Sequence, residues 1–367
     1  MNRLAQLSAL GQSVWYDQMR RSLLKEGTLK RFIEDDDLRG LTSNPTIFEK
    51  AIGGTNEYDE DLTRLAREGK DATAIYEALV YHDIGGAADA FRAVYDRTRK
   101  LDGYVSLEVD PRLAHDTQGT IDEAVRHFGA LGRPNVMIKI PATDEGIPAI
   151  EEAIALGLNV NVTLIFSCDV YEKVMEAYIS GLERRTDEGE DVIGIASVAS
   201  FFVSRIDSKV DGALASVEHG DSLDGTIAIA NAKVAYQLFL EKFSGERWGN
   251  LEAVGAQVQR PLWASTSTKN PAYSDVLYVD TLIGERTVNT LPPATFDAFR
   301  DHGTPRITIV DDLDTARRQM AELESLGISL EAITAELTAE GVKSFADSFK
   351  SMMATIEARR AQVLVTA

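Results

Sequence analysis

The chain has 367 residues, of which 44% are hydrophobic and 26% are charged, a composition that is typical of globular proteins and argues against disorder. Asp and Glu outnumber Lys and Arg by 58 to 38, so the net charge of −20 argues against broad binding to nucleic acid or an anionic membrane, although it allows one small basic pocket. The single cysteine, Cys168, excludes an intrachain disulfide and a thiolate metal cluster, and the histidines show no HxH or HExxH spacing that would indicate a metal site.

The sequence contains no apolar run of the ~18 residues that a membrane span requires. Its N-terminal segment, MNRLAQLSALGQSVWYDQMRR, lacks the apolar core and small-residue cleavage site of a signal peptide. We therefore expect a cytoplasmic protein.

Short β-like runs alternate with longer helical runs along the chain. We expect strands at residues 13–17, 39–42, 104–109, 136–140, 159–166, 195–202, 262–265 and 276–280. Helices are expected between them, at residues 71–80, 87–99, 121–131, 147–156, 169–184 and 223–241. This alternation predicts a parallel sheet, and eight strands are the number that closes an α/β barrel. An open doubly wound sheet is the alternative, but residues 15–20 contain no glycine-rich dinucleotide turn.

The last part of the chain, residues 316–367, is expected to be helical. Within residues 341–363, apolar side chains recur in three- and four-residue steps at Val342, Phe345, Phe349, Met352, Met353 and Ile356. Such a stripe favours a helix packed across the scaffold over a separate domain. The predicted fold is thus an α/β fold in which residues 1–367 form a single (β/α)8 TIM barrel, with residues 316–367 as additional C-terminal helices packed on it.

Polar residues occupy strand positions that should face the barrel interior. Strand side chains alternate between two faces, and in residues 136–140 the aliphatic residues share one face. Lys139 therefore points into the barrel, as do polar residues on other strands: Glu108, Asn161, Thr163 and Ser265. Because a barrel interior is normally aliphatic and active sites lie at the C-terminal strand ends, the set as a whole indicates function.

Of these positions, Lys139 gives the most specific indication of function. Burial of an ammonium group favours the neutral amine, which can attack a carbonyl group and form a Schiff base. Asp17, at the end of the first strand, and Glu108 would supply the acid/base pair that such chemistry needs. A buried ion pair between Lys139 and Glu108 is the structural alternative, and it is compatible with this chemistry.

An anion site is suggested near the last strands, where barrel enzymes often bind phosphate. Arg205 follows the sixth strand, and Ser265 and Lys269 belong to the segment after the seventh. The alternative is a surface Arg205 paired with Asp207 or Asp211.

Two turns are also notable. Pro45 forces Asn44 into an extended conformation just past the second strand, although this run by itself is better explained by a plain capped turn. Ser167 is expected to cap a helix, with Cys168 structural rather than reactive.

At these residues the sequence resembles the transaldolases. The matching segments, in the order found in that family, are LTSNPTIF (41–48), SLEVDP (106–111), MIKIPAT (137–143), NVNVTLIFS (159–167), SVASFFVSRID (197–207) and WASTSTKNP (263–271). The resemblance implies a class I aldolase-type barrel that needs no cofactor and no metal. It also implies transfer of a dihydroxyacetone unit in the non-oxidative pentose phosphate pathway. The donor would be sedoheptulose 7-phosphate or fructose 6-phosphate, and the acceptor glyceraldehyde 3-phosphate or erythrose 4-phosphate.

The resemblance also implies a role for each matching residue. Lys139 corresponds to the Schiff-base lysine and Asp17 to the acid/base that assists carbon–carbon cleavage, whereas Glu108 and Thr163 correspond to the residues that hold the catalytic water. The implied substrate ligands are Asn44, Asn161 and Ser200 for the dihydroxyacetone hydroxyl groups, and Arg205 and Ser265 for phosphate.

One segment departs from the family pattern. Many members carry Ser-Phe-Arg after the seventh strand, where this chain reads Ser265-Thr266-Ser267-Thr268-Lys269. Lys269 is expected to replace the arginine from a shifted position, as in a bacterial subgroup of the family. The alternatives are an aldolase that releases free dihydroxyacetone and a non-catalytic barrel that binds sugar phosphates. The expected partners are small sugar phosphates, with no nucleic acid or membrane, and the chain is expected to be a monomer or a homodimer.

Overall fold

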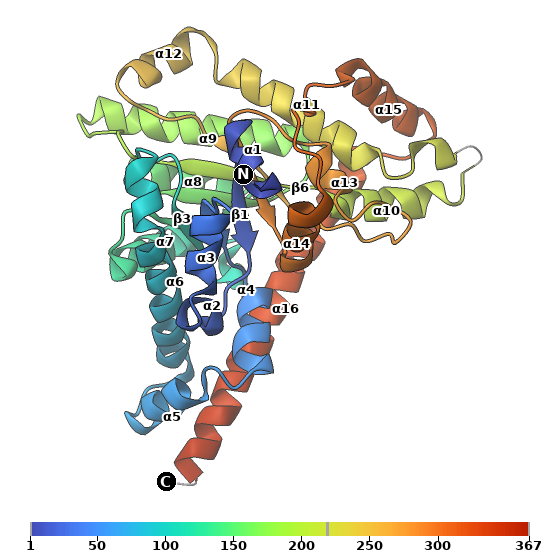
Figure 1. The fold of residues 1–367 in the computed structure, drawn as a ribbon. Helices are drawn as coiled ribbons and strands as arrows, with labels where there is room; N and C mark the ends of the chain where they lie inside the picture. The colour runs from blue at the N-terminus through green and yellow to red at the C-terminus, as the bar shows by residue number, and fades with distance from the viewer. Residues whose placement is uncertain (1, 218–219, 366–367) are drawn as a thin grey trace.

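The computed structural model describes residues 2–217 and 220–365, so the last two residues of the predicted tail, 366–367, lie outside the described residues. Within the described residues, eight parallel strands close into a barrel in which each strand pairs with its neighbours in chain order (Figure 1). The strands are β1 Gln12–Asp17, β2 Gly40–Thr42, β3 Tyr104–Glu108, β4 Val136–Pro141, β5 Val160–Ile165, β6 Ser197–Phe202, β7 Arg260–Ala264 and β8 Thr287–Leu291. The predicted barrel is confirmed, and the open sheet is excluded.

Helices surround the barrel and continue beyond its last strand. The α-helices are α1 Arg3–Ala9, α2 Arg21–Lys25, α3 Thr28–Asp35, α4 Pro45–Phe48, α5 Asp59–Arg67, α6 Ala72–Arg97, α7 Thr117–Leu131, α8 Gly146–Ala155, α9 Cys168–Asp187, α10 Ser204–Leu214, α11 Ile227–Lys242, α12 Gly245–Ala253, α13 Leu277–Asp280, α14 Pro293–His302, α15 Leu313–Ser325 and α16 Leu330–Val365. A π-helical turn, η1 Glu49–Gly53, follows α4, and two 3-10 turns are η2 Pro111–Leu113 and η3 Gly220–Leu223.

The predicted eighth strand was wrong. Residues 276–280 contain the short helix α13, and the eighth strand of the barrel is β8, Thr287–Leu291. Tyr278 and Val279 of α13 are both buried, so the sequence around them is apolar. A short apolar run does not distinguish a strand from a buried helix, and this run was therefore predicted as a strand. Three of the five residues of β8 are polar (Thr287, Asn289 and Thr290), so this strand lacks the apolar signal of its neighbours.

The two helical stretches expected at 71–80 and 87–99 form one continuous helix, α6. Gly85 and Gly86 lie inside it without breaking it. A Cβ atom at Gly85 would lie 3.0 Å from the guanidinium carbon of Arg133, and one at Gly86 would lie 3.0 Å from Leu24. These glycines therefore permit close packing of neighbouring side chains against α6.

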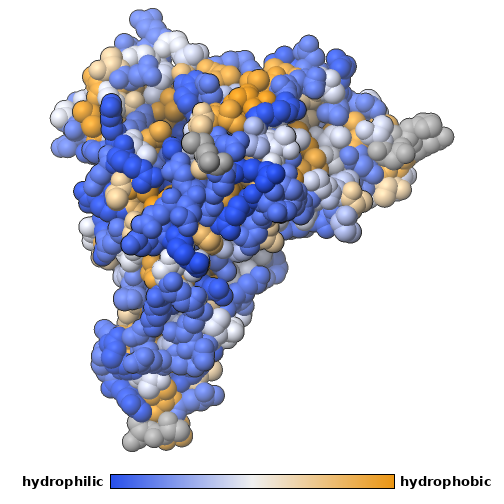
Figure 2. Space-filling view, in the orientation of Figure 1, coloured by the Kyte–Doolittle hydropathy of each residue, from blue (hydrophilic) through white to orange (hydrophobic). Residues whose placement is uncertain are grey.

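The C-terminal helix α16 runs across the barrel and extends beyond it, as Figure 1 shows. It packs against α4, η1, α5, α6, α10 and β5. The predicted apolar stripe faces this packing. Phe345, Phe349, Met352 and Ile356 are buried, and Val342 and Met353 are partly buried against the core. In the view of Figure 2, hydrophilic residues cover most of the surface, including the extension that contains α16. No helix in the described part of the chain combines the length and apolarity that crossing a membrane requires.

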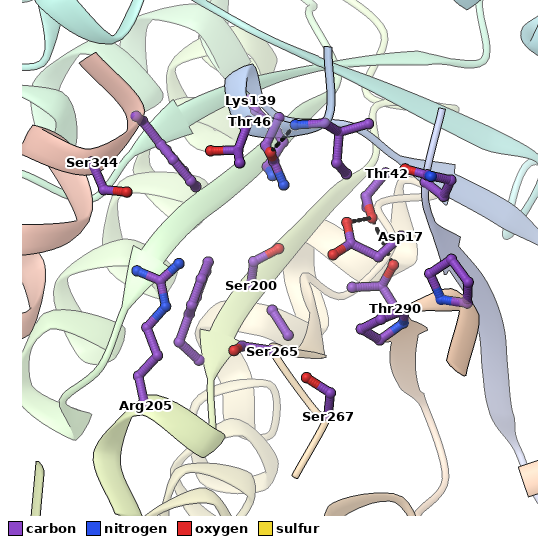
Figure 3. A pocket seen from close by; sticks show the side chains of 18 of the residues that line it. Asp17, Thr42, Thr46, Lys139, Ser200, Arg205, Ser265, Ser267, Thr290 and Ser344 are labelled. Atoms are coloured by element: carbon purple, nitrogen blue, oxygen red, sulfur yellow. Dashed lines mark hydrogen bonds between the residues drawn. The ribbon is translucent and has the colours of Figure 1, made fainter. Parts of the chain in front are cut away.

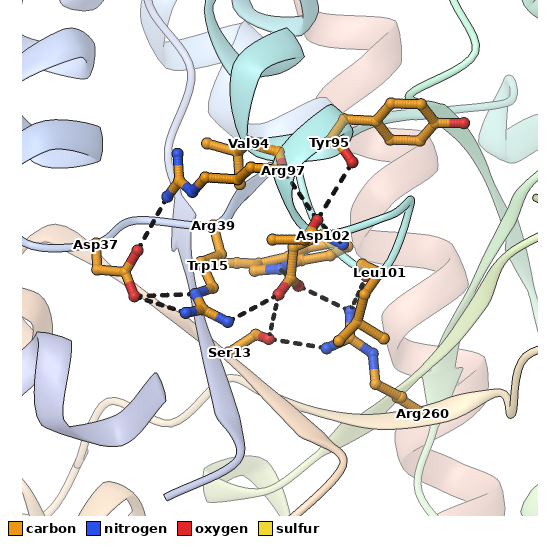
Figure 4. A network of polar contacts seen from close by, with 11 residues as sticks. Ser13, Trp15, Asp37, Arg39, Val94, Tyr95, Arg97, Leu101, Asp102 and Arg260 are labelled. Atoms are coloured by element: carbon orange, nitrogen blue, oxygen red, sulfur yellow. Dashed lines mark hydrogen bonds and ion pairs between the residues drawn. The ribbon is translucent and has the colours of Figure 1, made fainter. Parts of the chain in front are cut away.

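A buried polar network closes the N-terminal end of the barrel (Figure 4). Asp102, which has no solvent exposure, accepts hydrogen bonds from Arg260 Nη2 at 2.9 Å and from Ser13 Oγ at 2.8 Å. Arg39 Nη1 also reaches Asp102, at 3.4 Å. The buried carboxylate of Asp102 is thus paired with two arginines, at the end of the barrel opposite the C-terminal ends of the strands.

Candidate active site

A cavity of about 440 Å³ opens at the C-terminal ends of the barrel strands. Figure 3 shows side chains from several strands and their following loops converging on it. All the site residues predicted from the sequence line this cavity except Glu108, Asn161 and Thr163. The lining members of the predicted set are Asp17, Asn44, Lys139, Ser200, Arg205, Ser265 and Lys269.

Lys139 and Glu108 are direct neighbours on adjacent strands β4 and β3. Lys139 Nζ lies 3.6 Å from Glu108 Oε2 and donates a hydrogen bond to the carbonyl oxygen of Ser43 at 3.1 Å. Burial raises the pKa of Glu108 to about 7, although the positive charge of Lys139 opposes this shift. The ion pair expected as a structural alternative is thus present, at a spacing longer than a hydrogen bond. Burial brings the pKa of Glu108 close to neutral pH.

Asp17 faces the same cavity from the end of β1. Its Oδ1 accepts a hydrogen bond of 2.7 Å from Thr42 Oγ1, and this hydroxyl is also 2.6 Å from Thr290 Oγ1. Burial raises the pKa of the Asp17 carboxyl, whereas Lys139, Thr42 and nearby cations oppose the shift. Sequence reasoning missed both threonines, and Thr290 could not be found because it belongs to the unrecognised strand β8.

Asn161 joins three strands behind the cavity wall. Its Nδ2 donates to Ser106 Oγ at 2.9 Å, and its Oδ1 accepts from Ser200 Oγ at 2.7 Å. Two further buried oxygens, Thr163 Oγ1 and Glu108 Oε2, form no hydrogen bond with the described residues. Since buried polar atoms normally have partners, these two oxygens are available to bind a small polar molecule.

Asn44 has both of the properties that its sequence context suggested. Its backbone is extended, with φ −156° and ψ 168°, and its side-chain oxygen accepts a hydrogen bond from the Ile47 amide at 2.9 Å. Capping uses only the side-chain oxygen of Asn44. Its amide nitrogen is therefore available to donate a hydrogen bond in the cavity, which Asn44 lines.

Arg205 is half-buried and turned toward the cavity (Figure 3). Its guanidinium lies over the Phe202 ring at 5.3 Å. The alternative pairing with Asp207 or Asp211 is wrong, because Asp207 accepts hydrogen bonds from the Ala228 amide and the Tyr278 hydroxyl. The carboxylate of Asp211 likewise accepts bonds from the backbone of Gly225 and the hydroxyl of Tyr273.

The loop after β7 brings further polar groups to the cavity. Ser265 adopts a left-handed backbone with φ 55°, uncommon for a residue with a side chain, and its hydroxyl is 3.1 Å from Ser204 Oγ. Lys269 Nζ donates to Ser267 Oγ at 2.7 Å. The cavity therefore has cationic groups, Arg205 and Lys269, near the last strands. The acid/base groups, Asp17, Glu108 and Lys139, lie on β1, β3 and β4.

The expectations for Ser167 and Cys168 agree with the structure. Ser167 Oγ accepts a hydrogen bond from the Val170 amide at 3.2 Å, so Ser167 caps α9 as predicted. Burial raises the pKa of the Cys168 thiol to about 12, which keeps it protonated and unreactive. Among the described residues, no group of three or more His, Cys, Asp or Glu side chains is placed to hold a metal ion.

Known proteins similar to this chain come from one family. A family model described as "Transaldolase/Fructose-6-phosphate aldolase" matches residues 14–356. The chain belongs to this family. It is 46% identical to the transaldolase of Trichodesmium erythraeum over 97% of both chains, and 48% identical to the transaldolase of Parafrankia sp. over 96% of both. Transaldolase 1 of Streptomyces avermitilis is also 48% identical, over 94% of this chain and 92% of that protein. The transaldolase expected from the motifs is confirmed.

The cavity also contains residues that the sequence did not predict. Its lining also includes Lys50 of η1 and Ser344 and Phe345 of α16, none of which was predicted as a site residue. No local signal marks these positions, because Lys50 follows a motif without belonging to it, and α16 is separated from the barrel strands in sequence.

Proposed function

We propose that this transaldolase transfers a dihydroxyacetone unit from a ketose phosphate to an aldose phosphate through a Schiff base on Lys139. The observation that carries the proposal is the position of the Lys139 amine, buried at the wall of a polar cavity and 3.6 Å from Glu108 Oε2. A buried amine beside a group that exchanges protons near neutral pH suits nucleophilic attack on a carbonyl carbon. The donor would be sedoheptulose 7-phosphate or fructose 6-phosphate, and the reaction would belong to the non-oxidative pentose phosphate pathway.

The first half-reaction begins when Lys139 Nζ bonds to the C2 carbonyl carbon of the ketose. Loss of water from the resulting carbinolamine leaves an iminium ion. Asp17 then takes the proton of the C4 hydroxyl group, the C3–C4 bond breaks, and its electron pair moves into the iminium. An aldose phosphate leaves, and a three-carbon enamine stays bound to Lys139. The hydrogen bond from Thr42 holds the Asp17 carboxylate in place for this proton transfer.

The second half-reaction reverses these steps with the acceptor. The enamine carbon attacks the aldehyde of the incoming aldose phosphate, and Asp17 returns its proton to the new C4 hydroxyl group. Glu108 removes a proton from a water molecule, which adds to the iminium carbon and releases the new ketose. The free oxygens Glu108 Oε2 and Thr163 Oγ1 support their assignment as the groups that hold this water.

The remaining predicted residues suit the other parts of the substrate. The amides and hydroxyl group of Asn44, Asn161 and Ser200 would bind the hydroxyl groups of the dihydroxyacetone unit. Arg205, Ser265 and Lys269 would bind phosphate, because a guanidinium and an ammonium beside hydroxyl donors match its charge and its acceptor oxygens.

A second activity, release of free dihydroxyacetone to water, is kept as a candidate because the matching family description covers fructose-6-phosphate aldolases as well. Turnover of fructose 6-phosphate with and without an aldose-phosphate acceptor separates the two. Transfer predicts that turnover depends on the acceptor, whereas the aldolase predicts that it does not. The third alternative, a barrel without catalysis, is disfavoured by the relatives, which are named as enzymes.

Covalent trapping tests the proposal directly. Borohydride added with fructose 6-phosphate should reduce the imine and attach a sugar fragment to the peptide that contains Lys139, as detected by mass spectrometry. Lys139→Ala should abolish this adduct while circular dichroism shows the fold retained, and Lys70→Ala, at an exposed surface position, should leave it unchanged. Undiminished trapping in Lys139→Ala would refute the assignment.

The chain organisation is part of the same proposal. Residues 1–367 would work as one barrel domain whose tail, residues 316–367, completes the substrate cavity, since Ser344 and Phe345 of α16 line it. The cytoplasmic location, and the choice between monomer and homodimer, stay predictions from the sequence.

A further inference from the structure

Besides Lys139, three cationic side chains line the substrate cavity, and they come from three separate segments: Lys50 from η1, Arg205 from α10 and Lys269 from the loop after β7. Among the described residues, none of the three forms an ion pair with a carboxylate within 4.0 Å. The chain has a net charge of −20, so acidic partners are abundant elsewhere on the molecule. Cations that stay unpaired in such a protein indicate a bound anion.

The charges of Arg205 and Lys50 act on Lys269. Burial lowers the pKa of the Lys269 ammonium, and the positive charges of Arg205 and Lys50 lower it further, whereas the carboxylate of Asp17 opposes these shifts. This repulsion is unfavourable in the free enzyme, and an anion bound between the three groups would relieve it. Lys50 itself donates no hydrogen bond to any described residue. Its ammonium group, which lines the cavity, is therefore available to bind a ligand.

The position of Lys50 is defined by tertiary packing. It lies in the π-helical turn η1, directly after α4, and π-helical turns are often found at functional sites. Both α4 and η1 pack against α16, and Thr46 Oγ1 lies 2.8 Å from Ser348 Oγ of that helix. One turn earlier, Ser344 lines the same cavity, and Figure 3 shows it on the same side as Arg205, away from Asp17.

We propose that Lys50, together with Ser344 of the C-terminal helix, binds the phosphate group of the sugar substrates and makes the enzyme select phosphorylated acceptors. The inference rests on the proposed transaldolase function and extends it to residues outside the family motifs. A phosphate dianion offers three strongly accepting oxygens. Arg205 and Lys269 by themselves would give these oxygens only two cationic partners. Lys50 and Ser344 supply the additional charge and hydroxyl group from the remaining wall.

The decisive measurement is the preference for a phosphorylated acceptor. In a ping-pong transfer, kcat/KM for the acceptor depends only on the second half-reaction, so glyceraldehyde 3-phosphate and glyceraldehyde can be compared with one common donor. Lys50→Gln should lower the ratio of the two kcat/KM values about tenfold, which is the scale of one charge-assisted hydrogen bond. Ser344→Ala should lower the ratio about threefold, as expected for a neutral hydrogen bond.

Two further variants control the result. Lys350→Gln removes one positive charge from an exposed position of α16 outside the cavity, and it should leave the ratio unchanged. Lys50→Arg keeps the charge and should restore most of the preference. Titration calorimetry with inorganic phosphate gives a readout that needs no turnover, and Lys50→Gln should weaken this binding about tenfold relative to the unmodified enzyme.

The outcomes separate the two proposals. If the unmodified enzyme transfers dihydroxyacetone and Lys50→Gln changes neither the acceptor ratio nor phosphate binding, the role of Lys50 is refuted and the transaldolase function stands. If the unmodified enzyme shows no transfer at all, the proposed function fails, and the phosphate titration still decides whether Lys50 is part of an anion site.

Discussion

Thr46 and Ser348 share a hydrogen bond of 2.8 Å between their hydroxyl oxygens, although 302 positions separate them in the chain. Thr46 lies in α4, which begins directly after Asn44, and Ser348 lies in α16, whose residues Ser344 and Phe345 line the substrate cavity. The bond therefore links a loop of the barrel to the C-terminal helix at the edge of the active site. The helix is a wall of the site as well as a support for the barrel.

Displacing this helix should weaken substrate binding. A Cβ atom at Gly341 would lie 2.7 Å from Leu164 Cδ2, and Leu164 is fully buried at the end of β5. Gly341→Val should therefore push α16 away from the barrel, lower the free energy of unfolding by about 1–3 kcal/mol and raise KM. Urea denaturation and steady-state kinetics measure the two effects.

Gly129→Val is the matched control for this prediction, because nothing lies within 4 Å of a Cβ atom at the exposed Gly129 of α7. It should change the free energy of unfolding by less than about 0.5 kcal/mol and leave KM unchanged. Equal effects of the two substitutions would contradict the role given to α16.

Asp17→Asn should separate Schiff-base formation from carbon–carbon cleavage. The amide cannot take the proton of the C4 hydroxyl group, so cleavage should slow by roughly 10²–10⁴-fold while Lys139 still forms the imine. Borohydride trapping with fructose 6-phosphate should then leave the intact six-carbon sugar phosphate on Lys139, in place of the three-carbon fragment trapped in the unmodified enzyme. Mass spectrometry distinguishes the two adducts, and a three-carbon adduct in Asp17→Asn would assign the proton transfer to another group.

The activity should depend on the ionisation of Glu108. Burial raises the pKa of Glu108 to about 7, so the carboxylate that accepts a proton from water predominates above this pH and is lost below it. The rate of transfer should therefore fall as the pH drops through about 7. In Glu108→Gln the rate should be lower by roughly 10²–10⁴-fold, without this inflection. If the rate of Glu108→Gln still falls as the pH drops through about 7, Glu108 is not the group responsible for this pH dependence.

The buried His127 should make the fold sensitive to acid. Its Nδ1 lies 2.6 Å from the Tyr81 hydroxyl. Burial, reinforced by the positive charge of Arg126, lowers the pKa of His127 to about 4, although the negative charge of Asp110 opposes this shift. The unfolded chain takes up this proton near pH 6.5, whereas the folded protein takes it up only near pH 4. Stability is therefore complete above about pH 6.5 and falls as the pH drops toward 4, by about 3 kcal/mol.

Replacement of the histidine tests this assignment. The free energy of unfolding of His127→Gln, measured by urea denaturation at several pH values, should decrease less between pH 6.5 and 4 than that of the unmodified protein. His115→Gln, at an exposed position, should keep the original pH dependence. The assignment fails if His127→Gln retains the full loss of stability.

The sequence by itself determined the barrel, most of its strands and most of the predicted residues that line the cavity. Alternation of aliphatic and polar residues in β4 and β5 was enough to place Lys139 and Asn161 inside, because a side-chain period of two leaves no other face for them. The motif around Pro45 likewise predicted the extended Asn44, because proline restricts the residue before it.

Only the tertiary structure decided which distant segments complete the cavity. Strand β8 has too few apolar residues to be recognised, yet it pairs with β1 and β7, so its Thr290 reaches the hydroxyl group of Thr42. The stripe on α16 predicted a packed helix but not its partner, because many apolar surfaces would bury it equally well. Contact between segments far apart in the chain depends on how the closed barrel orients its loops, and no local pattern of residues encodes that geometry.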